Sequence, residues 1–142
     1  MKKQKIKIDL VHLGDEGCHI FCKAKIDGKK ARVLIDTGAS KTVLSKEFAN
    51  GLKRLKYLEL PEENGTAGIG PEKIEAQFAR IKSIQFKKLN IKKLVVGTID
   101  VTHVKQLYEN LNIKPFDLIL GGEVLEKYNA HIDYKNRILL LG

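Results

Sequence analysis

Apolar and polar residues alternate along most of this chain, a pattern that predicts strands. Near the start, Ile6, Ile8 and Leu10 alternate with charged residues, as in a half-buried strand. A second strand is predicted at 18–26, and Asp27-Gly28, a strong hairpin signal, joins it to a third at 31–35. The other predicted strands lie at about 57–60, 74–86, 89–96, 116–120, 130–134 and 137–141. The chain is therefore expected to be mostly β.

Three segments carry helical signals. Residues 45–49 suit a short helical turn that ends at Asn50-Gly51, residues 101–110 place apolar side chains at helical spacing, and residues 123–128 suit a short helix after Gly121-Gly122. No internal repeat, low-complexity segment or linker divides the sequence. At this length, residues 1–142 are predicted to form a single domain.

Composition narrows the class of protein. A chain that is 43% hydrophobic and 30% charged is typical of a soluble globular protein. No apolar run approaches the ~18 residues of a membrane span, and the basic segment 1–5 leads into an alternating pattern, so we expect no membrane association and a cytoplasmic location. Cys18 and Cys22 would lie on one strand face roughly 13 Å apart, too far for a disulfide, and are expected to be buried free thiols. Since His19 would face the other way and the four histidines lack ligand spacing, no metal site is expected.

The formal net charge of +9 raises the hypothesis of nucleic-acid binding. The basic residues are mostly lysines scattered along the sequence, aromatic residues are few, and no nucleic-acid motif accompanies them. We therefore expect a solvated, lysine-rich surface that modestly favours acidic partners, rather than a nucleic-acid partner.

Candidate chemistry lies at the end of the third predicted strand. The apolar run 33–35 is followed by Asp36-Thr37-Gly38-Ala39-Ser40. A carboxylate at the end of a buried strand is costly unless it is compensated, and in a partly desolvated, hydrogen-bonded turn it can serve as an acid or base. Asp, Thr, Gly and Ser are also common where an ordinary strand enters a turn, so the turn alone leaves both interpretations open.

Two later segments extend the pattern. The glycine-rich run 65–70 follows the turn, and the apolar run 116–120 leads into Gly121-Gly122 and a predicted helix. In order and spacing, these motifs resemble the retropepsin-like aspartic proteases, single-domain relatives of the pepsins. The resemblance implies a closed, mostly β barrel with a flap hairpin and one or two short helices. It also implies an endopeptidase that hydrolyses peptide bonds in a peptide or protein substrate by Asp-activated water, with no cofactor.

The resemblance also implies residue roles. Asp36 would be catalytic, Thr37 would tie two active-site turns together, and Gly38 would let backbone and substrate approach closely. Ala39 and Ser40 would line the substrate site; many family members carry an acidic residue at the latter position, so the departure bears on subsite preference. The flap tip and the supporting loop would comprise Gly68, Ile69 and Gly70, and Ile119, Leu120 and Gly121, respectively.

The chain holds a single Asp-Thr-Gly, although this chemistry requires two carboxylates. A second copy of Asp36 must come from another subunit across a two-fold axis, which predicts a homodimer. The terminal strand at 137–141 is a further candidate for the dimer interface. The alternative is a catalytically silent dimer that keeps the retropepsin fold as a protein-binding module, because a fold alone does not fix function.

Overall fold

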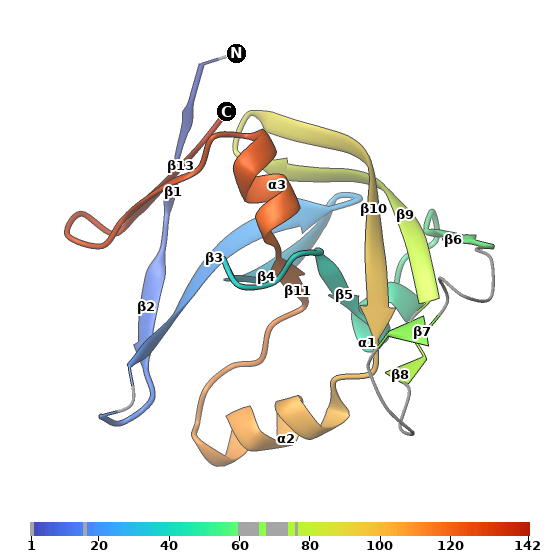
Figure 1. The fold of residues 1–142 in the computed structure, drawn as a ribbon, viewed down its shortest axis with the longest axis horizontal. Helices are drawn as coiled ribbons and strands as arrows, with labels where there is room; N and C mark the ends of the chain where they lie inside the picture. The colour runs from blue at the N-terminus through green and yellow to red at the C-terminus, as the bar shows by residue number, and fades with distance from the viewer. Residues whose placement is uncertain (1, 16, 60–65, 68–73, 76) are drawn as a thin grey trace.

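A computed structural model describes residues 2–15, 17–59, 66–67, 74–75 and 77–142 (Figure 1). The strands are β1 (Gln4–Lys7), β2 (Asp9–His12), β3 (Cys18–Ile26), β4 (Lys29–Ile35), β5 (Val43–Ser45), β6 (Lys56–Leu58), β7 (Thr66–Ala67), β8 (Ile74–Glu75), β9 (Gln77–Phe86), β10 (Leu89–Ile99), β11 (Leu118–Leu120), β12 (His131–Asp133) and β13 (Ile138–Leu141). The helices are α1 (Lys46–Asn50), α2 (Thr102–Asn110) and α3 (Gly122–Lys127).

A closed barrel forms the body of the molecule. Its strands follow the order β3-β4-β11-β5-β10-β9, and β9 returns to pair with β3 through Lys25↔Gln85 and Ile26↔Ile84. Two of the pairings, β4 with β11 and β5 with β10, are parallel, and the others are antiparallel. The predicted mostly β fold and closed barrel are confirmed.

The first predicted strand divides into two strands that belong to different sheets. β2 pairs with β3, whereas β1 pairs with β13, which also pairs with β12. The division falls at Ile8, whose backbone N–H donates to the Arg137 carbonyl at 3.0 Å. Ile6 and Ile8 are both buried, so the predicted alternation holds even though one strand becomes two. This arrangement brings the two termini close together (Figure 1).

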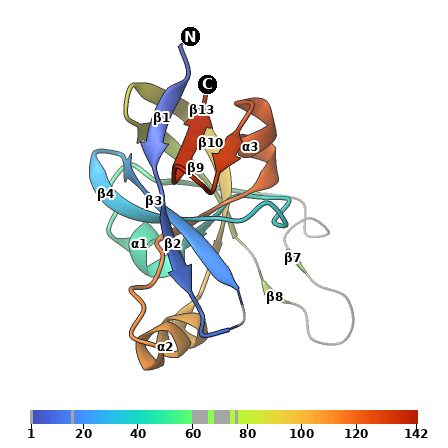
Figure 2. The ribbon, with the colours of Figure 1, turned by 90° about the vertical axis from the view of Figure 1, so that its left-hand side faces the viewer.

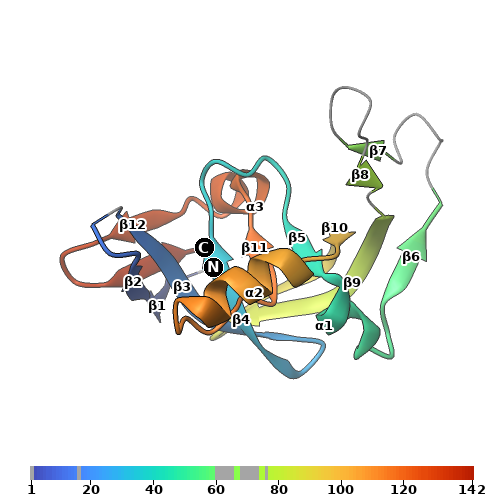
Figure 3. The same cartoon turned by 90° about the horizontal axis from the view of Figure 1, so that it is seen from below.

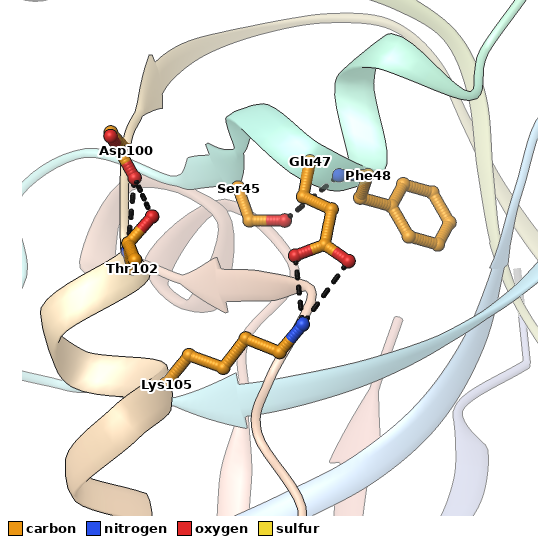
Figure 4. Close-up of polar contacts among 6 residues, drawn as sticks. All are labelled: Ser45, Glu47, Phe48, Asp100, Thr102 and Lys105. Carbon is orange, nitrogen blue, oxygen red and sulfur yellow. Dashed lines mark hydrogen bonds and ion pairs between the residues drawn. The ribbon is translucent and has the colours of Figure 1, made fainter.

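Helices form at all three predicted segments. The hydroxyl of Ser45 caps α1 by accepting from the Phe48 N–H at 3.1 Å. Figure 4 shows α1 and α2 joined by an ion pair in which Glu47 lies 3.0 Å from the Lys105 ammonium. On α2 only Tyr108 is buried, whereas Val104 and Leu107, together with Leu111 at the C-terminal cap, are exposed.

The two faces of β3 contribute to two apolar clusters. Cys22 and its neighbours on one face join the main core, while Phe21 on the other packs with Leu34, Tyr108 and Phe116. Both cysteines are free, as predicted; Cys22 is buried, but Cys18 is only half-buried. Among the described residues, no group of His, Cys, Asp and Glu could hold a metal, and no helix is long and apolar enough to cross a membrane.

Candidate active site

Asp36 directly follows β4, and the neighbouring strand β11 sets its position. The two strands run parallel, with Ile35 opposite Leu120, and the Asp36 N–H extends the ladder by donating to the Leu120 carbonyl at 3.1 Å. The turn then folds back on the carboxylate, because the Gly38 N–H donates to Asp36 Oδ1 at 3.0 Å and the Ala39 N–H to the Asp36 carbonyl at 3.2 Å. One oxygen of the carboxylate is thus fixed by the backbone of its own turn.

The carboxylate is nevertheless open to solvent in the single chain. Asp36, Thr37, Gly38 and Ser40 are exposed and Ala39 is half-buried. None of the described elements covers the turn, so Asp36 is solvated in one copy of the chain.

A cavity of about 300 Å³ adjoins the carboxylate. It is lined by Asp36 and Thr37 together with Cys18, His19, Ile20, Leu34, Ile35, Ile132 and Tyr134. His19 Nδ1 lies 3.0 Å from the Tyr108 hydroxyl, which fixes the ring beside the cavity. Burial raises the pKa of Tyr108, the Arg32 charge lowers it, and the Asp36 charge raises it further. The cavity therefore has both apolar walls and polar groups within reach of a ligand that contacts Asp36.

A buried network anchors the far end of the turn. Thr42 is fully buried; its hydroxyl donates to Glu123 Oε1 at 2.7 Å and accepts from the Gly121 N–H at 3.0 Å, while its own N–H donates to Glu123 Oε2 at 2.7 Å. Figure 3 shows the loop between β4 and β5 passing beside α3, the helix that carries Glu123. These bonds tie the segment that carries Asp36 to the start of α3.

The sequence reading missed both Thr42 and Glu123. Nothing in the sequence marks Thr42 as a buried hydroxyl. An acidic residue in the first turn of a helix is, however, a recognised signal for bonding to nearby backbone N–H groups. Glu123 occupies that position in α3, and its carboxylate also accepts from the Val124 N–H at 3.2 Å.

The two glycines at the start of α3, Gly121 and Gly122, lie against the Asp36 turn. A Cβ on Gly121 would lie 2.7 Å from the Lys41 carbonyl carbon and 2.9 Å from its oxygen, closer than any side chain tolerates. The Gly122 N–H donates to the Ala39 carbonyl at 2.6 Å. Of the other predicted supporting residues, Leu120 is buried in the main core and Ile119 packs against the cluster beneath α2.

The predicted flap tip, Gly68, Ile69 and Gly70, lies outside the described residues. The strands that flank it, β7 and β8, form an antiparallel pair in which Thr66 is opposite Glu75 and Ala67 opposite Ile74. Figure 2 shows this pair apart from the barrel strands. An antiparallel strand pair thus flanks the predicted flap tip.

Comparison with known proteins places this arrangement in a family. The family model described as "Aspartyl protease" matches residues 22–124, which include the Asp36 turn and the start of α3. Protein DDI1 homolog 2 of Danio rerio is 22% identical over 123 residues, which cover 87% of this chain and 26% of that protein. The chain thus spans about a quarter of the length of this curated relative.

Solved structures show the same fold. A retropepsin-like aspartic protease from Rickettsia conorii matches with a TM-score of 0.55 at 21% identity, covering 99% of this chain and 94% of the other. The retroviral protease-like domain of Ddi1 from Leishmania major matches with a TM-score of 0.58 at 20% identity, covering 85% and 86%. The barrel is therefore retropepsin-like, and this chain belongs to the aspartyl protease family.

Proposed function

We propose that this protein is an aspartic endopeptidase whose active site is completed by a second copy of the chain. The observation that carries the proposal is the state of Asp36. Its Oδ1 is fixed by the Gly38 N–H, yet Asp36, Thr37 and Gly38 are all exposed at the surface of the single chain. An ordered carboxylate on an exposed turn can meet its own copy across a two-fold axis, where both become shielded from water.

The chemistry follows from two carboxylates that share one proton. Two negative charges a few ångströms apart resist joint ionisation, so one Asp36 is ionised while the other is protonated. The ionised carboxylate accepts a proton from a water molecule as the water oxygen attacks the peptide carbonyl carbon. The protonated carboxyl donates a hydrogen bond to the carbonyl oxygen and stabilises the developing charge. Transfer of a proton to the amide nitrogen and cleavage of the C–N bond complete hydrolysis without a covalent enzyme intermediate.

The structure limits how two copies can meet. Both edges of β13 are already occupied within the chain, by β1 on one side and β12 on the other. Residues 137–141 can therefore contribute side chains to a dimer interface, but β13 has no free backbone edge for a further strand. We infer instead that the dimer forms around the exposed Asp36 turns, with the outer edges of β1 and β12 as the backbone edges left for pairing in this sheet.

Digestion of a diverse peptide pool by wild type and Asp36→Asn, from about pH 4 to about pH 8, tests the proposal, because this range brackets the working states of known carboxylate pairs. We expect cleavage by wild type and loss of cleavage in the variant, with both proteins sedimenting as dimers. Equal cleavage by the two proteins would show that Asp36 is not catalytic. A well-folded dimer that cleaves nothing would favour the protein-binding module, and a protein that stays monomeric at high concentration would refute the shared site.

A further inference from the structure

A second candidate site, independent of the Asp36 turn, lies on the outer face of the β3–β4 hairpin. Lys23 is paired directly opposite Arg32, and Lys25 directly opposite Lys30. Side chains paired in this way project from the same face of a sheet, and like charges placed opposite each other destabilise the pairing. The hairpin therefore carries four cations in a patch whose members repel one another.

These cations surround a hollow rather than a flat surface. A cavity of about 550 Å³ lies over the hairpin, and two further lysines reach it from elsewhere: Lys87 from the turn between β9 and β10, and Lys114 from the loop before β11. Its remaining lining residues are Ala24, Ala31, Gln85 and Asp117. Six cations from three separate segments thus converge on one concave site, although the lysines look scattered along the sequence.

Among the described residues, one carboxylate faces the six cations of this site. Asp117 is the acidic residue in the lining, and its Oδ2 accepts from the Arg32 backbone N–H at 2.8 Å. In the part of the chain that the structure describes, the one side-chain ion pair joins Glu47 to Lys105, and neither residue lines the cavity. Most of the repulsion within the site is therefore left for a ligand to offset.

The guanidinium of Arg32 is held in a fixed position by two contacts. Its guanidinium carbon lies 3.9 Å from the centre of the Phe21 ring, and its Nε donates to the Lys114 carbonyl at 3.1 Å. Phe21 is fully buried, so this stacking partner is rigid. A guanidinium fixed in this way loses little freedom when its terminal nitrogens bind a phosphate, while the lysines act as mobile point charges.

The turn that carries Lys87 is also built into the site. Lys87 has a backbone φ of 53°, a left-handed conformation that costs energy for a residue with a side chain. Gln85 supports this conformation, because its side-chain amide donates to the Lys87 carbonyl at 2.9 Å. Gln85 itself lines the cavity, so the same side chain forms part of the cavity wall and supports the strained turn.

We propose that this cavity binds a compact polyanion that carries two or more linked phosphate groups. Its volume is that of a small-molecule site, and cations that close in from three segments suit a compact ligand better than a polymer, which needs an open stripe. Among the residues that the structure describes, no aromatic side chain lines the cavity, so a nucleobase finds no stacking partner there. Arg32 precedes Asp36 by four residues on β4, roughly 13 Å along an extended strand, so this ligand and a substrate can be bound at the same time.

Calorimetric titration of the full chain with inorganic tripolyphosphate at low salt tests the site. We expect saturable binding that weakens as salt is added, and at least about tenfold weaker binding by Lys23→Gln/Lys30→Gln. The matched control, Lys53→Gln/Lys127→Gln, removes the same charge from exposed lysines outside the cavity, and we expect a change of less than about twofold. Without ligand, the hairpin variant should melt at or above the wild-type temperature, because cross-strand repulsion is removed.

A nucleoside triphosphate, a single-stranded RNA and an acidic peptide are titrated in parallel. The nucleoside triphosphate should bind about as well as tripolyphosphate, because the phosphates supply the contacts. Absence of tripolyphosphate binding at low salt, or equal losses in the two double variants, would overturn the proposal. Tighter binding of RNA or acidic peptide than of tripolyphosphate, with the same loss in the hairpin variant, would instead assign the surface to a polymer.

Discussion

The Thr42 network makes Thr42→Val a sharp test of how the Asp36 loop is held. Valine matches threonine in shape but replaces its hydroxyl by a methyl group. The substitution removes the bond to Glu123 Oε1 and takes the acceptor from the buried Gly121 N–H. Glu123 keeps its bonds from the Thr42 and Val124 backbone N–H groups, so the carboxylate is not left wholly unpaired.

The expected cost follows from the groups left without partners. A hydrogen bond to a charged group contributes about 1.5–3 kcal/mol, and a buried donor left unsatisfied costs about 1–3 kcal/mol. The two contributions overlap, so we expect the free energy of unfolding to fall by about 3 kcal/mol. For a chain of this size, this corresponds to a fall in melting temperature of about 10 °C.

Thr98→Val is the matched control. Thr98 is also buried, but its hydroxyl makes one longer bond, to the Gln77 carbonyl at 3.3 Å, and a neutral bond of this kind is worth only about 1 kcal/mol. Urea unfolding of both variants at one fixed protein concentration, which keeps any dimer contribution constant, gives the comparison. If Thr42→Val is no more destabilised than Thr98→Val, the network does not anchor the loop as we argue.

Two further predictions concern packing and titration. Gly121→Ala should lower the free energy of unfolding by about 1–3 kcal/mol, because its methyl group would meet the Lys41 backbone. Gly97→Ala should be tolerated, because the atom nearest to its methyl group would be 3.8 Å away. Urea unfolding of the two variants distinguishes these outcomes. Burial, reinforced by the charge of Asp9, raises the pKa of the Cys22 thiol from 9.0 to about 12, so the folded state disfavours the thiolate. The free energy of unfolding should therefore be retained below about pH 9 and fall as the pH rises towards 12, and it should fall less steeply in Cys22→Val. At pH 8, a thiol reagent should label Cys18 but should not label Cys22 until the chain is unfolded.

Local patterns carried much of the fold. Alternation placed β3 at its observed limits, and Asp27-Gly28 marked the hairpin because its two residues adopt the positive φ angles, 49° and 82°, that this turn requires. The division between β1 and β2 was not predictable, because the burial pattern of Ile6 and Ile8 continues through it. The backbone bond to Arg137 that marks the division comes from the other end of the chain.

The position of the candidate active site was predictable from the sequence, but its surroundings were not. The Asp-Thr-Gly motif located Asp36, but its exposure depends on what covers the turn, and no local pattern encodes that. Likewise, the basic residues are scattered along the sequence, and distance along the chain does not indicate which of them are cross-strand neighbours. Lys23 and Arg32 are nine positions apart in the sequence but directly opposite each other across the hairpin.

The pairing of β3 with β9 is the seam that closes the barrel, and it is short. Its length affects how the barrel opens. Beyond the paired residues Lys25↔Gln85 and Ile26↔Ile84, Asp27 continues the seam with its side chain: its N–H donates to the Ser83 carbonyl, and its Oδ1 accepts from the Ser83 N–H, both at 2.9 Å. The Asp27 carboxylate thus accepts a backbone hydrogen bond that the carbonyl of a strand residue would accept if the hairpin turn did not interrupt the ladder. Partial opening of the barrel need break only these few bonds while each hairpin stays intact. The Ser83 and Asp27 amides are therefore the positions at which hydrogen exchange would register such openings without global unfolding.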